Sequence, residues 1–549
     1  MKIIAKTLSS LESLGFTNPT NSIELECCSC FENEAYSFQL FYMAEGDAQA
    51  AYTIDYEIIT SLKNSFTVRE VSNVPVMRPC YEKRDDWYLS DKPGMFPDVL
   101  SKVNGNSIRA LNGVWKSLWI TLNEDLANLP AGDFSVTIRL FEHGNKSNYI
   151  DKILNIKILP ALLPPQKVSA TNWIHCDCIC DAENCRPFSA KFWSFLKKYL
   201  TLAAKNGQTM ALVPSFTPPL DTEIGEERKT IQLVKVTKTD EKYSFDFSLF
   251  RKYIEVCQES GISEFEHSHF FTQWGARHAP KIIATVDGKE KQIFGWETDS
   301  SSKEYFGFLH TYITELKKLI KELNLEKAFL FHVSDEPNEK AIEKYKIVSD
   351  FIHKELKGFR IGDALSNFDY YKKGIVSLPI VRTDSIIPFI ETGTEIWAYF
   401  TGEQCFDYSS NRLISMPAAR NRILGTQLFY YGIKGFLQWG LNYWYIFRSR
   451  HFFNPFISPD AEQYFTGGTS FIVYPGVIPS IRLMLFRDAM QDIRALELLA
   501  SLIGKSKVNE FIDNYWENFG FSGIKISADS FLKFREKINF EIEKNLSIQ

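Results

Sequence analysis

The chain has 549 residues, which is more than one domain usually holds and predicts roughly two to four folding units. Hydrophobic residues make up 45% of it and charged residues 23%, a balance that excludes a disordered protein. With 62 Lys and Arg residues against 67 Asp and Glu residues, the net charge is -5, which excludes the basic footprint of a nucleic-acid-binding protein.

The N-terminus carries no pattern of a secretory signal peptide, because its first apolar run is broken at Lys6. No stretch of about 18 uncharged apolar residues occurs, so we expect no membrane-spanning helix. Ten cysteines in a chain without an export signal are expected to be reduced thiols of a cytoplasmic protein.

Residues 1–160 are predicted to form an N-terminal β-sandwich domain. Apolar and polar residues alternate from Phe134 to Leu140, the period-2 pattern of a half-buried strand. Several short strands without helices between them are typical of a sandwich. The Pro-rich segment Leu159–Pro165 then predicts a domain boundary. The other strands are predicted at Ser37–Met43, Ala51–Ile59, Leu118–Leu122 and Ile153–Ile158.

Residues 166–500 alternate between strands and amphipathic helices, which predicts a catalytic (β/α)₈ barrel of the TIM type. One more strand is expected at Ser470–Tyr474 and helices from near Ser480; residues 501–549 are predicted to form a helical segment packed on the barrel. The eight barrel strands are predicted at Asn172–Ile179, Thr209–Val213, Glu264–Phe271, Ala328–Val333, Arg360–Ala364, Val376–Val381, Glu395–Phe400 and Gly435–Leu441.

The most informative segment is the apolar strand that leads directly into Asp335 and Glu336. Pro337 is predicted to stop this strand just after the two carboxylates. In a (β/α)₈ barrel the chemistry lies at the C-terminal ends of the strands, so the pair points to the expected active site. The other adjacent acidic pairs lie in charged or polar loops, where they are solvated turns.

Two carboxylates are the usual machinery of glycoside hydrolysis. Adjacent residues cannot easily lie on opposite faces of one sugar ring as acid and nucleophile. Consecutive Asp and Glu therefore indicate the substrate-assisted variant, in which the 2-acetamido oxygen of the sugar attacks. Glu336 would protonate the glycosidic oxygen, and Asp335 would accept the acetamido N–H and stabilise the oxazolinium ion.

Further motifs accompany the Ser334–Pro337 turn: Thr171–Asp177, Gly435–Trp444, Phe471–Gly476, Ser480–Arg482, Arg487-Asp488 and Asp492. Together they resemble glycoside hydrolase family 123, which belongs with proteins carrying the domain of unknown function 4091. The resemblance covers about residues 110–500. It implies a β-sandwich on a (β/α)₈ barrel, β-N-acetylgalactosaminidase activity, and Asp335 and Glu336 as the Asp-Glu pair. Ala489 departs from the Gly expected after Arg487-Asp488, on a terminal helix away from the chemistry.

Residues at the last two strand ends are predicted to bind the sugar. Trp439 and Asn442 follow the eighth strand and offer an aromatic floor and an amide for hydroxyls. Trp397 and Tyr399 end the seventh strand on one face, where the Tyr399 hydroxyl is expected to hold the acetamido oxygen. The alternative for these rings is packing at the barrel rim.

The third strand is predicted to end with His267 and His269 on one face. We expect His269 to bind a sugar hydroxyl; the alternatives are packing in the core and zinc binding, for which a third convergent ligand is missing.

On the first strand, Cys176, Cys178 and Cys180 are expected to share a face like small apolar residues, with Cys185 beyond. Their spacing is not that of a structural zinc site, so no metal or cofactor is predicted. Asp177, on the opposite face near the strand's end, is predicted to bind sugar hydroxyls.

The leading hypothesis is a cytoplasmic exo-acting hydrolase that releases β-linked N-acetylgalactosamine from a glycan, with no nucleic acid or membrane as partner. One alternative is a retaining glycosidase with Glu336 as acid/base and an enzyme carboxylate as nucleophile. Glu403 is the stronger candidate for that nucleophile, because Glu395 starts the seventh strand instead of ending it. The other alternative is a non-catalytic carbohydrate-binding protein, against which the intact acid pair argues.

Overall fold

The computed structural model describes residues 1–47, 51–336 and 341–547, so the predicted strand stop at Pro337 lies outside the described residues. The N-terminal region consists of two five-stranded sheets, ordered β1-β3-β8-β5-β6 and β2-β10-β9-β4-β7. Phe38, Ile120, Ile138 and Ile156 come from both sheets and are buried in one shared core. The strands are β1 Lys2–Ser9, β2 Cys27–Phe31, β3 Tyr36–Glu45, β4 Ala51–Ile59, β5 Phe66–Val76, β6 Gly94–Lys102, β7 Ser107–Leu111, β8 Lys116–Leu122, β9 Gly132–Glu142 and β10 Asn145–Leu159.

The next region contains eight parallel strands that form a nearly closed, barrel-like sheet, in the order β11-β22-β21-β20-β19-β18-β15-β12. Its two end strands also meet, because the Thr209 amide donates to the Ala170 carbonyl at 3.0 Å. Gly435 lets β22 approach β21, since a Cβ there would lie 2.0 Å from the Trp397 ring. The strands are β11 Ser169–Asn172, β12 Met210–Val213, β15 Glu264–His267, β18 Phe329–Phe331, β19 Arg360–Leu365, β20 Leu378–Arg382, β21 Trp397–Tyr399 and β22 Gly435–Gln438.

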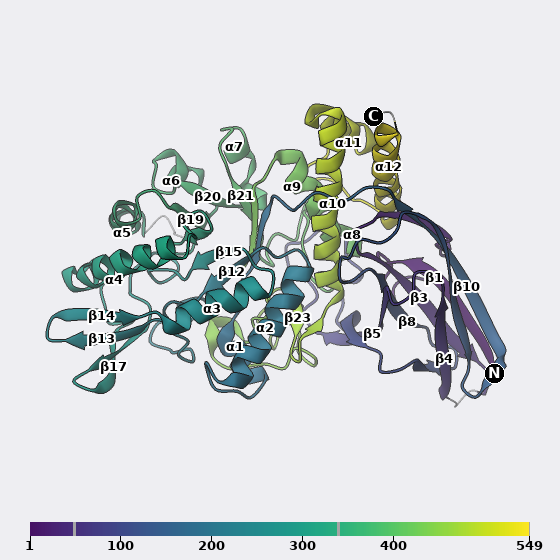
Figure 1. Ribbon diagram of the computed structural model, residues 1–549, viewed down its shortest axis with the longest axis horizontal. Coiled ribbons are helices and arrows are strands. Elements are labelled where there is room, and N and C mark those ends of the chain that lie inside the picture. The colour runs from purple at the N-terminus through teal and green to yellow at the C-terminus, as the bar shows by residue number, and fades with distance from the viewer. Residues whose placement is uncertain (48–50, 337–340, 548–549) are drawn as a thin grey trace.

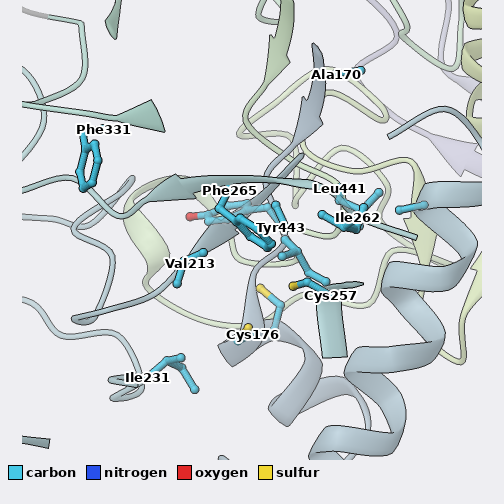
Figure 2. Packing of buried hydrophobic residues seen from close by; sticks show 14 of the residues in the cluster. Ala170, Cys176, Val213, Ile231, Cys257, Ile262, Phe265, Phe331, Leu441 and Tyr443 are labelled. Carbon is cyan, nitrogen blue, oxygen red and sulfur yellow. The ribbon is translucent and has the colours of Figure 1, made fainter. Parts of the chain in front are cut away.

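The predicted first barrel strand is wrong beyond Asn172, where β11 ends. Residues Cys176–Ala182 form helix α1 instead. All of the residues from Cys176 to Cys180 are buried, so their alternation in polarity did not reflect alternation in exposure. The cysteines therefore do not line one face of a strand. Cys176 lies with Cys257 among the apolar side chains between the barrel and its helices (Figure 2).

Helices connect successive barrel strands and cover the outside of the barrel, where α2 and α4 match the predicted amphipathic helices (Figure 1). Buried side chains such as Leu196, Phe308 and Tyr312 pack these helices onto the strands. The helices are α2 Ala190–Lys205, α3 Ser248–Glu259, α4 Lys303–Glu322, α5 Ile342–Glu355, α6 Phe368–Lys372, α7 Ile387–Ile390, α8 Ala418–Arg422 and α9 Leu424–Tyr431.

A small four-stranded sheet that the sequence analysis did not predict extends from the barrel (Figure 1). It is built from two hairpins in the connections after β12 and β15, which pair through β13 and β16. Its strands are β13 Lys235–Thr239, β14 Lys242–Asp246, β16 Ile282–Val286 and β17 Lys289–Phe294.

The chain ends with helices that lie between the barrel and the N-terminal sheets (Figure 1). Arg535 pairs with Glu34 of the N-terminal region at 2.7 Å and with Asp492 at 2.9 Å. The C-terminal segment, predicted to pack on the barrel, thus contacts both regions. Ala489 packs closely against Gly425, at which a Cβ would lie 2.1 Å from the Ala489 carbonyl oxygen. The elements are β23 Val473–Tyr474, β24 Ile478–Pro479, α10 Ile481–Ile503, α11 Lys505–Tyr515 and α12 Ala528–Leu546.

None of the helices in the described parts of the chain is long and apolar enough to cross a membrane.

Candidate active site

A cavity of about 1020 Å³ opens at the C-terminal ends of the barrel strands. Each strand contributes to its wall through its end or through the loop that follows it, as expected for the functional face of such a barrel. Its lining residues are Tyr81, Trp173, His175, Leu220, Asp221, Gln273, Trp274, Asp335, Glu336, Ala364, Arg382, Tyr399, Thr401, Gly402, Glu403, Leu437, Trp439, Tyr443, Phe465 and Thr469.

The acid pair predicted from the sequence lies in this cavity, just after β18. The Tyr399 hydroxyl donates to Oε1 of Glu336 at 2.6 Å, and the Trp274 amide donates to the Asp335 carbonyl oxygen at 2.9 Å. Glu336 has φ of 42°, in the left-handed region that non-glycine residues rarely adopt. Backbone strain of this kind is concentrated at active sites, where the surrounding structure holds it in place.

The environment of the pair favours protonated carboxyl groups. Burial raises the pKa of Glu336, and the hydrogen bond from Tyr399 opposes that rise. Burial and the charge of Glu336 raise the pKa of Asp335 well above its usual range, while the charge of His332 opposes this. The charge of Glu336 thus makes a second carboxylate at Asp335 unfavourable.

A buried charge network connects three neighbouring strands, with Glu266 on β15, His332 directly after β18 and Asp363 on β19. Nε2 of His332 lies 2.9 Å from Oε2 of Glu266, and Nδ1 of His332 lies 3.6 Å from Oδ1 of Asp363. Trp173 Nε1 donates to the same Glu266 oxygen at 2.8 Å, and the Tyr345 hydroxyl donates to Asp363. Burial lowers the pKa of His332, but the nearby carboxylates of Asp363 and Glu266 outweigh burial and raise the pKa to about 10.

A second polar chain supports the opposite wall of the cavity. Arg228 donates to both carboxylate oxygens of Asp177, at 2.7 and 2.8 Å, and to Nδ1 of His175 at 3.1 Å. His175 Nε2 in turn donates to the Trp439 carbonyl oxygen at 2.8 Å. Burial and the charge of Arg228 lower the pKa of His175 to about 4, so its ring is neutral at pH 7. This chain fixes two residues of the lining, His175 and Trp439.

Four of the eight predicted site residues line the cavity: Asp335, Glu336, Tyr399 and Trp439. The lining found among the described residues does not include Asp177, His269, Trp397 or Asn442. Of these, Asp177 lies on α1 and not on a strand, and its carboxylate forms an ion pair with Arg228. Burial alone raises the pKa of Asp177, but the charge and hydrogen bonds of Arg228 outweigh it and lower the pKa.

The contacts of Asn442 and Trp397 give both residues a structural role. Asn442 exchanges two hydrogen bonds with the backbone of His175, at 2.8 and 3.1 Å, and so joins the ends of the eighth and first strands. Trp397 is completely buried inside the barrel against Gly435. Trp397 and Tyr399 do share a face, as predicted, but only Tyr399 reaches the cavity.

The prediction that His267 and His269 share a face is wrong, because β15 ends at His267 and the alternation stops there. His267 points to helix α4, where its Nε2 lies 2.8 Å from the Tyr312 hydroxyl. His269 stacks on His332 inside the barrel, with ring centroids 4.6 Å apart. Burial lowers the pKa of both imidazoles, that of His267 to about 3.

No group of three or more His, Cys, Asp or Glu residues is placed to hold a metal ion in the described part of the chain. All ten cysteines are free thiols. Burial raises the pKa of Cys176, Cys178 and Cys180, which disfavours the thiolate that metal binding needs.

The N-terminal region also contributes to the cavity, through Tyr81. The segment that carries this residue is bound to the barrel loops. Arg420 makes two 2.8 Å bonds to Asp85, and the Met77 and Arg78 amides both donate to Asp460 at 2.8 Å. Sequence reasoning missed this contribution, because no local pattern links residues more than 300 positions apart.

The two rival nucleophiles lie in different places. Glu403 is exposed and lines the cavity in the loop after β21. Glu395 is exposed just before β21 and is not part of the lining found in the described residues.

A family model described as glycoside hydrolase 123, catalytic domain, matches residues 173–499. The chain belongs to glycoside hydrolase family 123. This match confirms the resemblance drawn from the motifs and includes the acid pair. No curated protein sequence matches the chain significantly.

The structure is also similar to a family 123 glycoside hydrolase from Clostridium perfringens, with a TM-score of 0.74, 14% sequence identity and 100% of both chains covered. At 14% sequence identity, this similarity shows that the two proteins share a fold. A family 39 glycoside hydrolase from the gut symbiont Bacteroides cellulosilyticus WH2 has a TM-score of 0.33 and 10% identity, with 80% of each chain covered. The chain is thus a glycoside hydrolase with sheets at its N-terminus, a nearly closed parallel barrel and C-terminal helices.

Proposed function

We propose that this family 123 enzyme is an exo-acting β-N-acetylhexosaminidase that releases β-linked N-acetylgalactosamine. The observation that carries the proposal is the position of Asp335 and Glu336, adjacent in sequence, in one cavity at the barrel's C-terminal face. The Clostridium perfringens relative was analysed for glycolipid glycan hydrolysis, which supports a glycan as the substrate class here.

In this mechanism Glu336 is the general acid. Burial raises its pKa, so the carboxyl group keeps its proton at higher pH than an exposed Glu and can give it to the glycosidic oxygen. Tyr399 lies within hydrogen-bond distance of Glu336 and therefore close to the bond that breaks. After cleavage Glu336 accepts a proton from the water that opens the intermediate.

Asp335 orients the nucleophile that the substrate brings. It accepts the acetamido N–H, so that the carbonyl oxygen attacks the anomeric carbon and forms an oxazolinium ion. Making the attack intramolecular contributes on the order of 7–11 kcal/mol when the reacting atoms are held close together. The negative charge of Asp335 then stabilises the positive ring that develops.

The wall of the cavity supplies groups suited to a pyranose. Trp439 offers a half-buried ring as a sugar platform. Asp221, held by the Tyr443 hydroxyl at 2.6 Å, offers a carboxylate for sugar hydroxyls. These residues support a bound sugar ring next to the acid pair.

We also infer that the parallel sheet is a (β/α)₈ barrel of the TIM type and that the N-terminal sheets form a β-sandwich, since helices connect the strands of the former and one core joins the latter. A cytoplasmic location remains part of this proposal and is supported by the ten cysteines, all of which are free thiols.

The test is a panel of chromogenic β-glycosides that differ at C2 and C4, assayed with the purified protein. We expect hydrolysis of the 2-acetamido galactoside and no measurable hydrolysis of the matching 2-hydroxy sugar. Faster hydrolysis of the gluco-configured 2-acetamido sugar would correct the assignment of the sugar. Preference for a 2-hydroxy glycoside would contradict the substrate-assisted mechanism.

A further inference from the structure

The loop after β12 places one carboxylate, that of Asp221, in the wall of the cavity. Asp221 has φ of 41°, in the left-handed region that non-glycine residues rarely adopt. Its amide donates to Oε1 of Gln273 at 2.8 Å, and its carbonyl oxygen accepts from the Ser449 hydroxyl at 2.6 Å. Partners from the loops after β15 and β22 thus hold the backbone of this residue in place.

Two donors occupy one oxygen of the Asp221 carboxylate and leave the other for a ligand. The Tyr443 hydroxyl at 2.6 Å and the Arg448 amide at 3.0 Å both donate to Oδ2. Burial raises the pKa of Asp221, while these two donors oppose the rise and favour the carboxylate. Oδ1 has no hydrogen-bond partner among the described residues, and every other polar atom of Asp221 is already bonded. Oδ1 is therefore an acceptor fixed in place before a ligand enters the cavity.

The contacts of Asp221 also relate it to the acid pair. The strands β12, β15 and β18 are neighbours in the barrel, and the acid pair follows β18. Gln273, which accepts from the Asp221 amide, is followed by Trp274, whose amide donates to the Asp335 carbonyl oxygen at 2.9 Å. Asp221 therefore lies on the side of the cavity that is continuous with Asp335.

A sugar that reacts at the acid pair presents its remaining hydroxyls in a fixed order. C1 lies at Glu336 and the C2 acetamido group at Asp335, so C3 and C4 follow around the ring toward the loops after β15 and β12. The ring of Trp439, the platform for the sugar, contacts the ring of Tyr443 with centroids 5.0 Å apart, and Tyr443 holds Asp221. The hydroxyl on C4 of a sugar on this platform is thus directed to Asp221.

We propose that Asp221 is a specificity-determining residue whose Oδ1 accepts a hydrogen bond from the 4-hydroxyl of the bound sugar. The 4-hydroxyl is axial in galacto and equatorial in gluco sugars, so one fixed acceptor serves only one of the two well. A site built to bind a hydroxyl rejects analogues that do not present it, because its own polar atom is then left unpaired. This role rests on the proposed function and names the residue that reads the sugar's configuration.

The experiment measures kcat/KM of the wild type and Asp221→Asn on an aryl β-N-acetylgalactosaminide and its 4-deoxy and 6-deoxy analogues. The asparagine oxygen can keep both donors of Oδ2, which turns the NH₂ group toward the cavity in place of Oδ1. A hydrogen bond to a charged group is worth about 10–100-fold, so the wild type should lose that factor on the 4-deoxy sugar. Asp221→Asn should lose the same factor on the parent sugar and less than about threefold more on the 4-deoxy sugar.

Glu223→Gln is the matched control, because Glu223 lies in the same loop and pairs with Arg448 and Arg450 outside the described lining of the cavity. Its 4-deoxy penalty should equal that of the wild type. A 4-deoxy penalty as large in Asp221→Asn as in the wild type would overturn the proposal. Coupling of Asp221 to the 6-hydroxyl instead, or a penalty equally lost in Glu223→Gln, would also overturn it.

The wild type alone provides a second test if Asp221→Asn does not fold. N-acetylgalactosamine should inhibit the wild type about 10–100-fold more strongly than its 4-deoxy analogue. Equal inhibition by the two sugars would overturn the proposal. An enzyme that prefers 2-hydroxy glycosides would contradict the proposed function, while the same 4-deoxy comparison in the 2-hydroxy series would still report on Asp221.

Discussion

The hydroxyl of Tyr399 donates to Oε1 of Glu336 across 2.6 Å, from the end of the strand β21 to the residue pair that follows β18. This bond stabilises the ionised form of Glu336, whereas burial of the carboxyl group favours the protonated form. Tyr399 is thus in direct contact with the proposed acid of the reaction. If the acetamido oxygen of a bound substrate accepts the hydrogen bond of the Tyr399 hydroxyl in place of Glu336, the pKa of Glu336 rises further.

Tyr399→Phe should therefore raise the pKa of Glu336 in the free enzyme. The lost bond stabilised the carboxylate, so the proton should be held up to a higher pH. Because a hydrogen bond to a charged group contributes about 1.5–3 kcal/mol, we expect the basic limb of kcat/KM to move up by about one to two pH units. A basic limb that stays in place, or moves to lower pH, would show that Tyr399 does not act on Glu336.

Glu336→Gln should slow the hydrolysis of substrates with poor leaving groups by about 10²–10⁴-fold, the usual contribution of a positioned general acid. Activated aryl glycosides need little protonation and should lose much less. The ratio of wild-type to variant kcat/KM, measured on both kinds of substrate, decides whether Glu336 is the general acid. Equal losses on both kinds of substrate would mean that Glu336 is not the proton donor.

The acid pair was predictable from the sequence because its signal is local. An apolar strand that runs straight into Asp335 and Glu336 places both carboxylates at a strand end, where barrel chemistry lies. Trp439 and Tyr399 reach the cavity for the same reason. Most of the barrel strands were also predictable, because they are short, largely apolar runs between helices; the first was not, because β11 is the mostly polar segment Ser169–Asn172.

The positions of the predicted site residues that do not line the cavity depend on contacts between distant parts of the chain. Asp177 pairs with Arg228, which lies 51 positions later in a loop without a recognisable pattern. His269 lies just beyond the end of a strand, where the two-residue alternation no longer decides which way a side chain points. Sequence reasoning assigned no role to Glu266, the carboxylate next to His332; its position near the end of the same strand is the signal that could have found it.

Asp177→Asn should destabilise the protein far more than it changes sugar binding. Removing one partner of a buried ion pair costs about 3–5 kcal/mol, because the other charge is left uncompensated. The matched control is Asp181→Asn on the same helix, whose ion-pair partner Lys229 is partly exposed; the Asn oxygen can still accept the Tyr445 hydrogen bond, so this change should cost less than about 1 kcal/mol. Unfolding in denaturant measures both. An Asp177→Asn protein of unchanged stability with a raised KM would restore the sugar-binding prediction.

Glu403→Gln should retain most of the activity, because in the substrate-assisted mechanism no enzyme carboxylate attacks the sugar. Glu403 is nevertheless an exposed carboxylate in the wall of the cavity, so it is the residue that a two-carboxylate mechanism would use. Steady-state kinetics on an aryl β-N-acetylgalactosaminide distinguish the two. A loss of several orders of magnitude that added azide or formate restores would identify Glu403 as the nucleophile.

The most direct test of the central claim is the rate of hydrolysis of aryl β-N-acetylgalactosaminides whose acetyl group carries zero, one, two or three fluorine atoms. If the acetamido oxygen is the nucleophile that Asp335 orients, each fluorine weakens it, and kcat/KM should fall steeply along the series. Rates that are independent of fluorine would show that the oxygen does not attack the anomeric carbon, and would contradict the substrate-assisted mechanism.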